Sequence, residues 1–321
     1  MKALNALVIG LGGIGFGYDQ NHMEDRDIVT THVKAFYDHP DYNLIGVVDS
    51  DETKCQMVAQ NCGSVSSSNL SYFSKDNIDI VSIATPTDSH FEVFKKTLLL
   101  KPKVILCEKP FSGNLLQAQR MIDLSKKEGT NIVVNYIRRF EPGTIEFLDS
   151  IRNGEIGDIE KGVIWYSKGL VNNGSHYIDL LNSLWGEPDR IRVLDYVREL
   201  SKQDFEVDLA LHYGEKTIYM MAAQEENFSY HKMELVGTQG CAFYNQGGRE
   251  IYIQRVSNDP LFSGYRILGS RSEITSYFLK YQSKVLDNII AFIAGTEKLR
   301  STGESALGAL KVLNHIKIEL L

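Results

Sequence analysis

The stretch ALVIGLGGIG, residues 6–15, decides the fold that the sequence predicts. A short apolar run leads into a turn with glycines in the pattern G-x-G-x-x-G. In this pattern Gly10 permits a tight turn, Gly12 lets the backbone approach a pyrophosphate, and Gly15 permits close packing of the next residues. Backbone N–H groups of the turn would face the phosphates of a bound dinucleotide. The residues expected in this contact are Gly10, Gly12, Gly13, Ile14 and Gly15.

The first 135 residues alternate short, β-branched apolar runs with longer helix-like stretches. Short, continuously apolar runs are typical of strands that are buried on both faces. Strands that alternate with helices predict right-handed βαβ units around a parallel sheet. The runs are 6–9, 44–48, 80–84, 104–107 and 132–134, and helices are expected near 31–38, 53–61, 89–99 and 114–128.

The second half of the chain has the pattern of an antiparallel sheet. Residues 205–213, FEVDLALHY, alternate between apolar and polar side chains, and residues 231–237 and 250–256 do so as well. This alternation indicates strands that are covered on one face only. Two helices are expected to close the chain, near 274–295 and 303–320.

These patterns predict an α/β protein with an N-terminal doubly wound Rossmann domain and a C-terminal α+β domain with a mostly antiparallel open sheet. The dinucleotide-binding domain is expected at residues 1–135, joined by the C-terminal helix 303–321. A domain for substrate binding and oligomerisation is expected at residues 136–302. The partly exposed sheet of this second domain suggests a homo-oligomer.

The bulk composition is that of an ordinary soluble globular protein: 321 residues, 43% hydrophobic and 23% charged. A formal net charge of −7 and the lack of a long basic run argue against nucleic acid or an anionic membrane as the main partner. No apolar stretch approaches the roughly 18 residues of a membrane span, and the N-terminus does not read as a secretory signal. The four cysteines have no metal-like spacing and suggest reduced thiols, so we expect a cytoplasmic protein without a metal.

Asp49 ends the apolar run LIGVV and is expected to accept hydrogen bonds from the ribose hydroxyls of the adenosine. Its carboxylate would repel a 2′-phosphate, which favours NAD over NADP. The alternative is an aspartate that only closes a turn at a strand end. The fingerprint expects the acid about 20 residues after the glycines, but Asp49 lies 34 residues after Gly15.

The surplus lies in residues 16–31, FGYDQNHMEDRDIVTT, which are polar and lack a helical period. We interpret them as a loop inserted between the glycine turn and a helix that starts near Thr31. The loop could fold over cofactor or substrate as a lid, using Tyr18, Asp19 or His22. The alternative is a surface excursion without a role.

Two further segments are expected at the ligand-binding edge of the sheet, because ligands bind beyond the carboxyl ends of the strands in open α/β sheets. ATPTDSH, residues 84–90, follows one apolar run, and Glu108-Lys109-Pro110 ends another. Lys109 could relay a proton there, and its bond to Pro110 could be cis. The alternative is a solvated lysine. The residues expected at the cofactor from these segments are Thr85, Pro86, His90, Glu108 and Lys109.

Six motifs follow one another along the chain: GLGGIG, VVD, ATPTDSH, CEKPFSGN, VVNYIRRFEP and NNGSHYIDLLNSLWG. In this order they resemble the Gfo/Idh/MocA family, the glucose–fructose oxidoreductase and inositol dehydrogenase group. The resemblance spans most of the chain, including ITSYFLKYQSKVLDNIIAFIAG and STGESALGALKVLNHI. It implies a nicotinamide-dependent hydride transfer at a carbinol carbon, and a homo-dimer or homo-tetramer.

The resemblance also implies catalytic residues. The lysine of the family's Glu-Lys-Pro motif falls on Lys109, and its active-site histidine falls on His176, with Asp179 following on the same helix. Family members commonly carry an aspartate four residues before that histidine, where this chain has Asn172. Asparagine can hydrogen-bond a hydroxyl but cannot take a proton, so Lys109 or His176 must do so. The alternative for His176 is a helix-capping or core histidine.

Further residues are expected at the substrate. The resemblance places Tyr136, Arg138 and Arg139 near the crossing into the second domain, where the charges could hold a phosphate or carboxylate or form ion pairs between domains. Trp165 and Lys168 end the first strand of that domain; the indole suits stacking on a sugar ring, and core packing is the alternative. The residues expected at the substrate are Lys109, Tyr136, Arg139, Trp165, Lys168, Asn172 and His176.

The sequence thus predicts an NAD-dependent dehydrogenase acting on a secondary alcohol of a sugar, polyol or nucleotide sugar, with NADP the less favoured cofactor. Two alternatives stay open. One is a redox-neutral lyase or hydrolase that retains NAD. The other is a non-catalytic relative that senses cofactor or sugar, which Asn172 favours and which Lys109 and His176 oppose. The expected partner is a small molecule, without nucleic acid or membrane.

Overall fold

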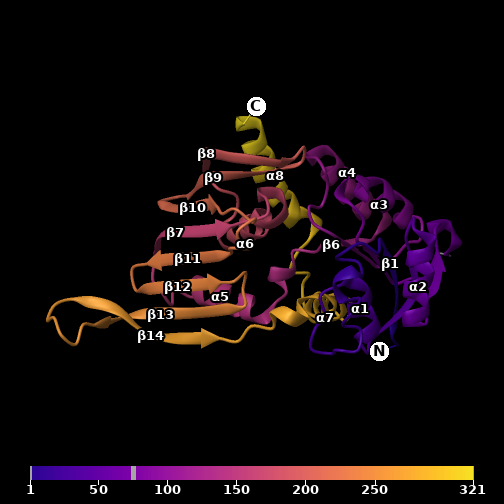
Figure 1. The fold of residues 1–321 in the computed structure, drawn as a ribbon, viewed down its shortest axis with the longest axis horizontal. Coiled ribbons are helices and arrows are strands. Elements are labelled where there is room, and N and C mark those ends of the chain that lie inside the picture. The colour runs from indigo at the N-terminus through magenta and orange to yellow at the C-terminus, as the bar shows by residue number, and fades with distance from the viewer. Residues whose placement is uncertain (1, 74–76, 321) are drawn as a thin grey trace. The chain divides into compact units, whose positions relative to one another are not determined.

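The computed structural model describes residues 2–73 and 77–320. Within them the chain forms a six-stranded parallel sheet and an eight-stranded, mostly antiparallel sheet (Figure 1). The predicted fold class, a doubly wound Rossmann sheet together with an α+β part, is confirmed. No helix in these two ranges combines the length and the apolar character needed to cross a bilayer.

The chain divides into two compact units. The first unit consists of residues 2–140 and 279–307, and the second of residues 141–278 and 308–320. The division falls inside α8, Gly303–Glu319, whose first residues group with the first unit and the remainder with the second. The domain boundaries expected from the sequence stay a prediction.

The parallel sheet of the first unit has the strand order β3-β2-β1-β4-β5-β6. The order reverses between β1 and β4, and ligands of doubly wound sheets bind beyond the carboxyl ends of the strands at such a switch point. The runs of sequence predicted as strands form β1, β2, β4, β5 and β6, while the short β3 was not predicted. The bounds are β1 Leu4–Ile9, β2 Tyr42–Val48, β3 Val65–Ser67, β4 Ile80–Ile83, β5 Val104–Cys107 and β6 Asn131–Val134.

Helices pack around this sheet and complete its core. Side chains of α1 and α7, such as Phe36 and Ile289, are buried in one cluster with Val8 of β1 and Leu106 of β5. Three of the helices begin at a residue whose side chain accepts a main-chain N–H of the first turn: Thr31, Asp51 and Asn114. The bounds are α1 His32–Asp38, α2 Glu52–Cys62, α3 His90–Leu98, α4 Leu115–Glu128 and α7 Tyr281–Ile293.

The sheet of the second unit has the strand order β14-β13-β12-β11-β7-β10-β9-β8, and β7 pairs with β10 in parallel. Figure 1 shows these strands side by side, with the β13–β14 hairpin reaching beyond the rest of the sheet. The bounds are β7 Ile159–Tyr166, β8 Arg190–Ser201, β9 Asp204–Tyr213, β10 Lys216–Ala222, β11 Lys232–Gly237, β12 Gly240–Asn245, β13 Glu250–Asn258 and β14 Arg266–Ile274.

Two helices, α5 (Pro142–Arg152) and α6 (Ser175–Trp185), pack on one face of this sheet through ring contacts such as that of Trp185 with Tyr213. The opposite face carries half-exposed side chains. The helix expected from residue 274 begins only at Tyr281, because β14 extends to Ile274.

Candidate functional site

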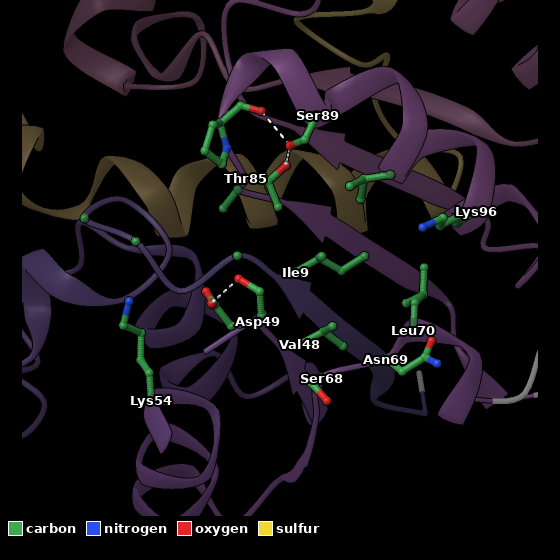
Figure 2. A pocket seen from close by; sticks show the side chains of 17 residues that line it. Ile9, Val48, Asp49, Lys54, Ser68, Asn69, Leu70, Thr85, Ser89 and Lys96 are labelled. Atoms are coloured by element: carbon green, nitrogen blue, oxygen red, sulfur yellow. Dashed lines mark hydrogen bonds between the residues drawn. The ribbon is translucent and has the colours of Figure 1, made fainter. Parts of the chain in front are cut away.

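A cavity of about 800 Å³ lies in the first unit, at the carboxyl ends of β1, β2 and β4 (Figure 2). Its volume is in the range of about 300–1,000 Å³ that is usual for ligand and cofactor pockets. The glycine turn, the acid after β2 and the turn after β4 form much of its wall. The residues expected at the cofactor that line it are Gly10, Gly12, Gly13, Asp49, Thr85 and Pro86.

The glycines of the turn meet different steric demands. Gly10 has φ +93°, and a Cβ there would lie 2.7 Å from the carbonyl oxygen of Ala84. A Cβ on Gly15 would lie 2.1 Å from the carbonyl oxygen of Gly10, so Gly15 serves packing within the turn. A Cβ on Gly12 would meet no atom within 4 Å. The space beside Gly12 therefore belongs to the cavity, where a pyrophosphate can approach the backbone.

Asp49 connects the second strand to the glycine turn. Its carboxylate accepts hydrogen bonds from the main-chain N–H of Leu11 at 2.6 Å and of Asp51 at 2.9 Å. These bonds fix the carboxylate at the cavity wall. Figure 2 shows it beside the ends of Ile9 and Val48, with Lys54 and Lys96 on opposite sides of the cavity.

The glycine turn leads into one helical turn, with the N–H of Phe16 donating to the carbonyl of Gly12 at 3.0 Å, and α1 continues this turn only after residues 18–31. In an unbroken α-helix the carbonyl of Ile14 would accept from residue 18, but it accepts from the N–H of His32 at 3.1 Å. The carbonyl of Gly15 likewise accepts from Val33 at 3.0 Å. Residues 18–31, 14 in number, are therefore an insertion within one helix, and without them the 34 residues between Gly15 and Asp49 become 20. That is the spacing of the dinucleotide fingerprint.

Hydrogen bonds anchor the insertion at both of its ends. Asp19 is fully buried, and its carboxylate accepts from the main-chain N–H and the hydroxyl of both Thr30 and Thr31. The N–H of Val29 donates to the carbonyl of Leu279 at 2.8 Å. The Lys34 ammonium on α1 donates to the carbonyl of Met23. Asp19 thus holds the insertion together.

The turn after β4 is fixed by side chains. The Ser89 hydroxyl donates to the carbonyl of Pro86 at 2.7 Å and hydrogen-bonds the hydroxyl of Thr85 at 2.8 Å (Figure 2). The fully buried His90 ring hydrogen-bonds the carbonyls of Thr85 and Pro110. His90 is not among the residues that line the cavity; it ties the Thr85 turn to the turn after β5.

Glu108 and Lys109 follow β5 and face different surroundings. Glu108 is buried, and its carboxylate accepts from His32, from Asn135 and from the main-chain N–H of Lys109. The Lys109–Pro110 peptide bond is cis. Tyr136 is buried, and Arg139 donates to the carbonyl of Arg300 at 2.6 Å, so both are held within the first unit.

The second unit carries its predicted site residues on one strained segment after β7. Lys168 has φ +68°, a value that costs energy in a residue with a Cβ and that occurs frequently at functional sites. A π-helical turn, Leu170–Gly174, then leads directly into α6; such turns are also frequent at functional sites. Asn172 is exposed in this turn, and His176 lies, largely buried, in the first turn of α6.

Two carboxylates from β9 hold this segment, and neither of them was expected at a site from the sequence. Glu206 is fully buried and accepts from the N–H of Lys168 at 3.0 Å and from the Arg198 guanidinium at 2.7 Å. Asp204 accepts from the N–H of Asn172 at 3.0 Å, and its other oxygen accepts from the N–H of Val171. Glu206 occupies a polar position of the alternating run 205–213, which predicts an exposed side chain, so the pattern of the sequence did not mark it.

Lys168 pairs with a third carboxylate, Glu225, at 3.2 Å. Burial acts to raise the pKa of Glu225, but hydrogen bonds from Ser229, Ser167 and Lys168 outweigh it, and the net pKa lies below its ordinary value. This acid therefore stays ionised beside the lysine at neutral pH.

Trp165 lies on the sheet face opposite to that of Tyr166, because side chains alternate along a strand. Its ring contacts that of Tyr230, with the centroids 5.9 Å apart. Tyr166, by contrast, is fully buried and donates its hydroxyl to the carbonyl of Val207. Trp165 and Tyr166 therefore serve different faces of the sheet.

The predicted site residues thus form two sets. The glycine turn, Asp49, Thr85 and Pro86 surround one cavity in the first unit, and Lys109 belongs to the same unit. Lys168, Asn172 and His176 lie on one segment of the second unit. Across residues 2–73 and 77–320 there is no cluster of three or more His, Cys, Asp or Glu side chains that could hold a metal ion.

The fold and the cavity define a protein of the NAD-binding Rossmann class. Residues 4–136 match the family model GFO_IDH_MocA, described as an oxidoreductase family with an NAD-binding Rossmann fold. The match covers the N-terminal part of the chain, which therefore carries the NAD-binding Rossmann domain of this Gfo/Idh/MocA family.

Oxidoreductases are also found among the proteins that are similar to this chain in sequence or in structure. The uncharacterized oxidoreductase YhhX of Escherichia coli is 27% identical over 180 residues, 51% of this chain and 52% of the relative. An inositol 2-dehydrogenase of Rhizobium meliloti is 26% identical over 129 residues, 40% of this chain and 39% of the relative. The chain thus spans about half, or less, of these relatives' length. Among solved structures, the UDP-N-acetylglucosamine 3-dehydrogenase of Acidithiobacillus ferrooxidans shares the fold with a TM-score of 0.75 at 16% identity, covering 99% of this chain and 98% of that one.

Proposed function

We propose that the protein is an NAD-dependent oxidoreductase that transfers a hydride between nicotinamide and a secondary alcohol of a sugar, polyol or nucleotide sugar. The observation that carries this proposal is the cavity beside Gly12, where the backbone is open to a pyrophosphate, with Asp49 at its wall. The named dehydrogenases among the similar proteins, which act on inositol and on a UDP-sugar, support the substrate class.

The proposed binding mode uses the residues of the cavity. N–H groups of the glycine turn would hold the pyrophosphate, and Asp49 would accept hydrogen bonds from the adenosine ribose. A carboxylate at that place disfavours a 2′-phosphate, which supports NAD. Lys54 and Lys96 also line the cavity and would offset part of the negative charge of the cofactor.

The proposed chemistry divides between cofactor and protein. The nicotinamide, when bound, supplies the hydride acceptor for oxidation of the alcohol. As the hydride leaves the carbinol carbon, the hydroxyl proton passes to Lys109 or His176. Asn172 can hydrogen-bond a substrate hydroxyl but cannot take this proton. Lys168, held beside Glu225, presents a charge to a polar substrate.

The asparagine at position 172 supports a second candidate function. Because Asn172 stands where related proteins commonly carry an aspartate, the chain is also a candidate for a redox-neutral reaction with retained NAD, or for a sensing role without turnover. Lys109 and His176, both retained, favour turnover. Changing Asn172→Asp would restore the acid: a dehydrogenase gains activity or a new acidic limb in its pH profile, whereas a sensor stays silent.

We further propose that the protein forms a homo-oligomer through the open face of the second unit's sheet. Val163 and Val236 are each 37% exposed on that face, beside the stacked and largely buried rings of Phe243 and Tyr252. Exposed apolar surface of this kind is typical of interfaces. Analytical ultracentrifugation of the wild type and of the double variant Val163→Glu, Val236→Glu tests it; an unchanged mass would exclude this face.

The decisive experiment monitors absorbance at the reduced-nicotinamide band. Purified protein is mixed with NAD or NADP and a panel of inositols, free sugars and UDP-sugars. We expect a rise with NAD and one substrate class, and a loss of about 10²–10⁴-fold in turnover for Lys109→Ala. Lys103→Ala, an exposed lysine just before β5, serves as the matched control. If absorbance does not rise with any compound of the panel although NAD binds measurably, the dehydrogenase proposal is contradicted.

A further inference from the structure

Five elements of the first unit meet at a buried hydrogen-bond network beneath the Lys109 turn. Its centre is the fully buried ring of His32, the first residue of α1. Nε2 of His32 lies 2.8 Å from Oε1 of Glu108, which follows β5. Nδ1 lies 2.8 Å from the Ser82 hydroxyl on β4 and 3.1 Å from Nε2 of Gln282 on α7. Asn135, which follows β6, donates to both Glu108 and Gln282.

The hydrogen-bond partners in this network show which nitrogen of the His32 ring carries a proton. The Asn135 amide donates to Oε1 of Gln282 at 3.1 Å, so the other end of Gln282 is its NH₂ group. That group donates to Nδ1 of His32, which must therefore be an acceptor. Nε2 of His32 then carries a proton and donates it to Glu108, an acceptor when ionised.

Glu108 is consequently a buried negative charge in contact with Lys109. One oxygen accepts from His32 and Asn135, and the other accepts from the main-chain N–H of Lys109 at 3.1 Å. Burial acts to raise the pKa of Glu108, but the hydrogen bond and electrostatic attraction of His32, the hydrogen bond from Asn135 and the charge of Lys109 outweigh it, and the net pKa lies below its ordinary value.

The titratable groups that face Glu108 are His32 on α1, Lys109 itself, Cys107 on β5 and Tyr281 on α7. Burial raises the pKa of Cys107 well above its ordinary value, and burial together with Glu108 raises that of Tyr281. Both groups stay neutral near neutral pH. The charge of Glu108 is thus balanced by His32, by the Asn135 amide and by Lys109.

The interrupted helix explains how His32 reaches this place. Because the N–H of His32 bonds to the carbonyl of Ile14, His32 occupies the second turn of the helix that starts at the glycine loop. The anchored insertion brings it there across 14 residues. The cofactor turn and the Lys109 turn are therefore connected through one imidazole.

We propose that His32 is a positioning residue for Lys109: by donating to Glu108 it fixes the carboxylate that holds the Lys109 main chain. The proposal rests on the proposed catalytic role of Lys109. His32 and Glu108 are not among the residues lining the cavity, so their loss should impair turnover and leave NAD affinity in place.

Three variants test the proposal, each measured for NAD affinity, thermal stability and the pH profile of kcat and kcat/KM. His32→Leu removes the donor to Glu108, and we expect kcat to fall about 10- to 100-fold, with NAD affinity within about twofold. His32→Gln keeps a donor and an acceptor and should recover most of kcat. In Glu108→Gln the lysine loses a negative neighbour and gives up its proton more readily, so the acidic limb of the profile should move to lower pH.

His39→Leu is the matched control, since His39 follows the other end of α1 and also pairs with a carboxylate, Asp287. It should leave kcat and the pH profile unchanged. A purely structural role for His32 would lower the melting temperature without moving the pH profile, and Leu and Gln would then act alike. Wild-type kcat and profile in His32→Leu, with Lys109→Ala inactive, would overturn this proposal alone; an active Lys109→Ala would overturn the role of Lys109 itself.

Discussion

The carbonyl oxygen of Ile14 accepts a hydrogen bond from the main-chain N–H of His32 at 3.1 Å, across 18 residues of sequence. The two residues are neighbours on one helix whose chain leaves after the first turn and returns. The glycine turn and the helix behind it therefore keep the geometry of a dinucleotide site, although the sequence spacing departs from the fingerprint.

Deletion of residues 18–31 should rejoin the helix in register, because His32 would then follow Gly17. We expect a folded protein, since Asp19 and its threonine partners leave together. The Michaelis constant for NAD should rise about threefold or more, which corresponds to at least about 0.6 kcal/mol, because the ring of Tyr18 lies against Gly13 at the cavity wall. Steady-state kinetics at saturating substrate measure it.

Unchanged constants in the deletion variant would instead support a surface excursion without a role. The anchoring bonds of the insertion also predict that it acts as a fixed cover. Hydrogen exchange of residues 29–31 should therefore be slow both with and without NAD.

Substitutions of two glycines in the turn should affect different properties, stability in one case and NAD affinity in the other. Gly15→Ala places a Cβ 2.1 Å from the Gly10 carbonyl oxygen and should destabilise the fold by about 1–3 kcal/mol. Gly12→Ala meets no protein atom within 4 Å, so the melting temperature should hold while NAD affinity falls. Urea unfolding and calorimetric titration of both variants test this, and parallel losses of stability would contradict an open cofactor space beside Gly12.

Asp49 should set the choice of cofactor. We expect Asp49→Asn to lower the preference for NAD over NADP about tenfold, because the repulsion of a 2′-phosphate disappears. Ratios of kcat/KM for the two cofactors measure the effect. Asp51→Asn is the control, since asparagine still caps α2. Equal ratios in the wild type and Asp49→Asn would mean that Asp49 only closes its turn.

Asp204 should position the segment that carries Asn172. Asp204→Ala leaves the main-chain N–H groups of Val171 and Asn172 without their acceptor, and we expect kcat/KM for the alcohol to fall about tenfold with NAD affinity unchanged. Asp189→Ala, which removes an acceptor for the N–H of Gly214, is the control. Identical effects of both substitutions would remove Asp204 from the substrate side.

Glu108 should make stability depend on pH in the acid range. Its folded pKa lies below the ordinary value of 4.5, so the ionised form stabilises the fold above that value, and the contribution is lost as pH falls through the folded pKa. The difference in unfolding free energy between the wild type and Glu108→Gln should therefore be constant above about pH 6 and shrink below about pH 4. Urea titrations show it; the exposed Glu128→Gln should show no such trend.

Elements with a strong local pattern were predictable from the sequence. The apolar strands β1, β2, β4, β5 and β6 and the helices between them match the predicted runs within a few residues. Four strands of the second sheet were not predicted: β8, β10, β12 and β14. Most side chains of β8 and β14 are exposed, so no apolar period marks them. The strands β10 and β12 are short, with seven and six residues. The short β3 has three residues, too few for any period.

The candidate site also has a part that was predictable from the sequence and a part that was not. The sequence determined the parallel sheet, the glycine turn and the acid after β2, because strand runs and turn glycines are local requirements of the backbone. Only the tertiary structure decided that residues 18–31 interrupt a helix, that His32 meets Glu108, and that Asp204 and Glu206 hold the Lys168–Asn172 segment. These contacts join residues far apart in the chain, and their partners are chosen by which buried polar groups remain to be satisfied once the strands and helices have packed.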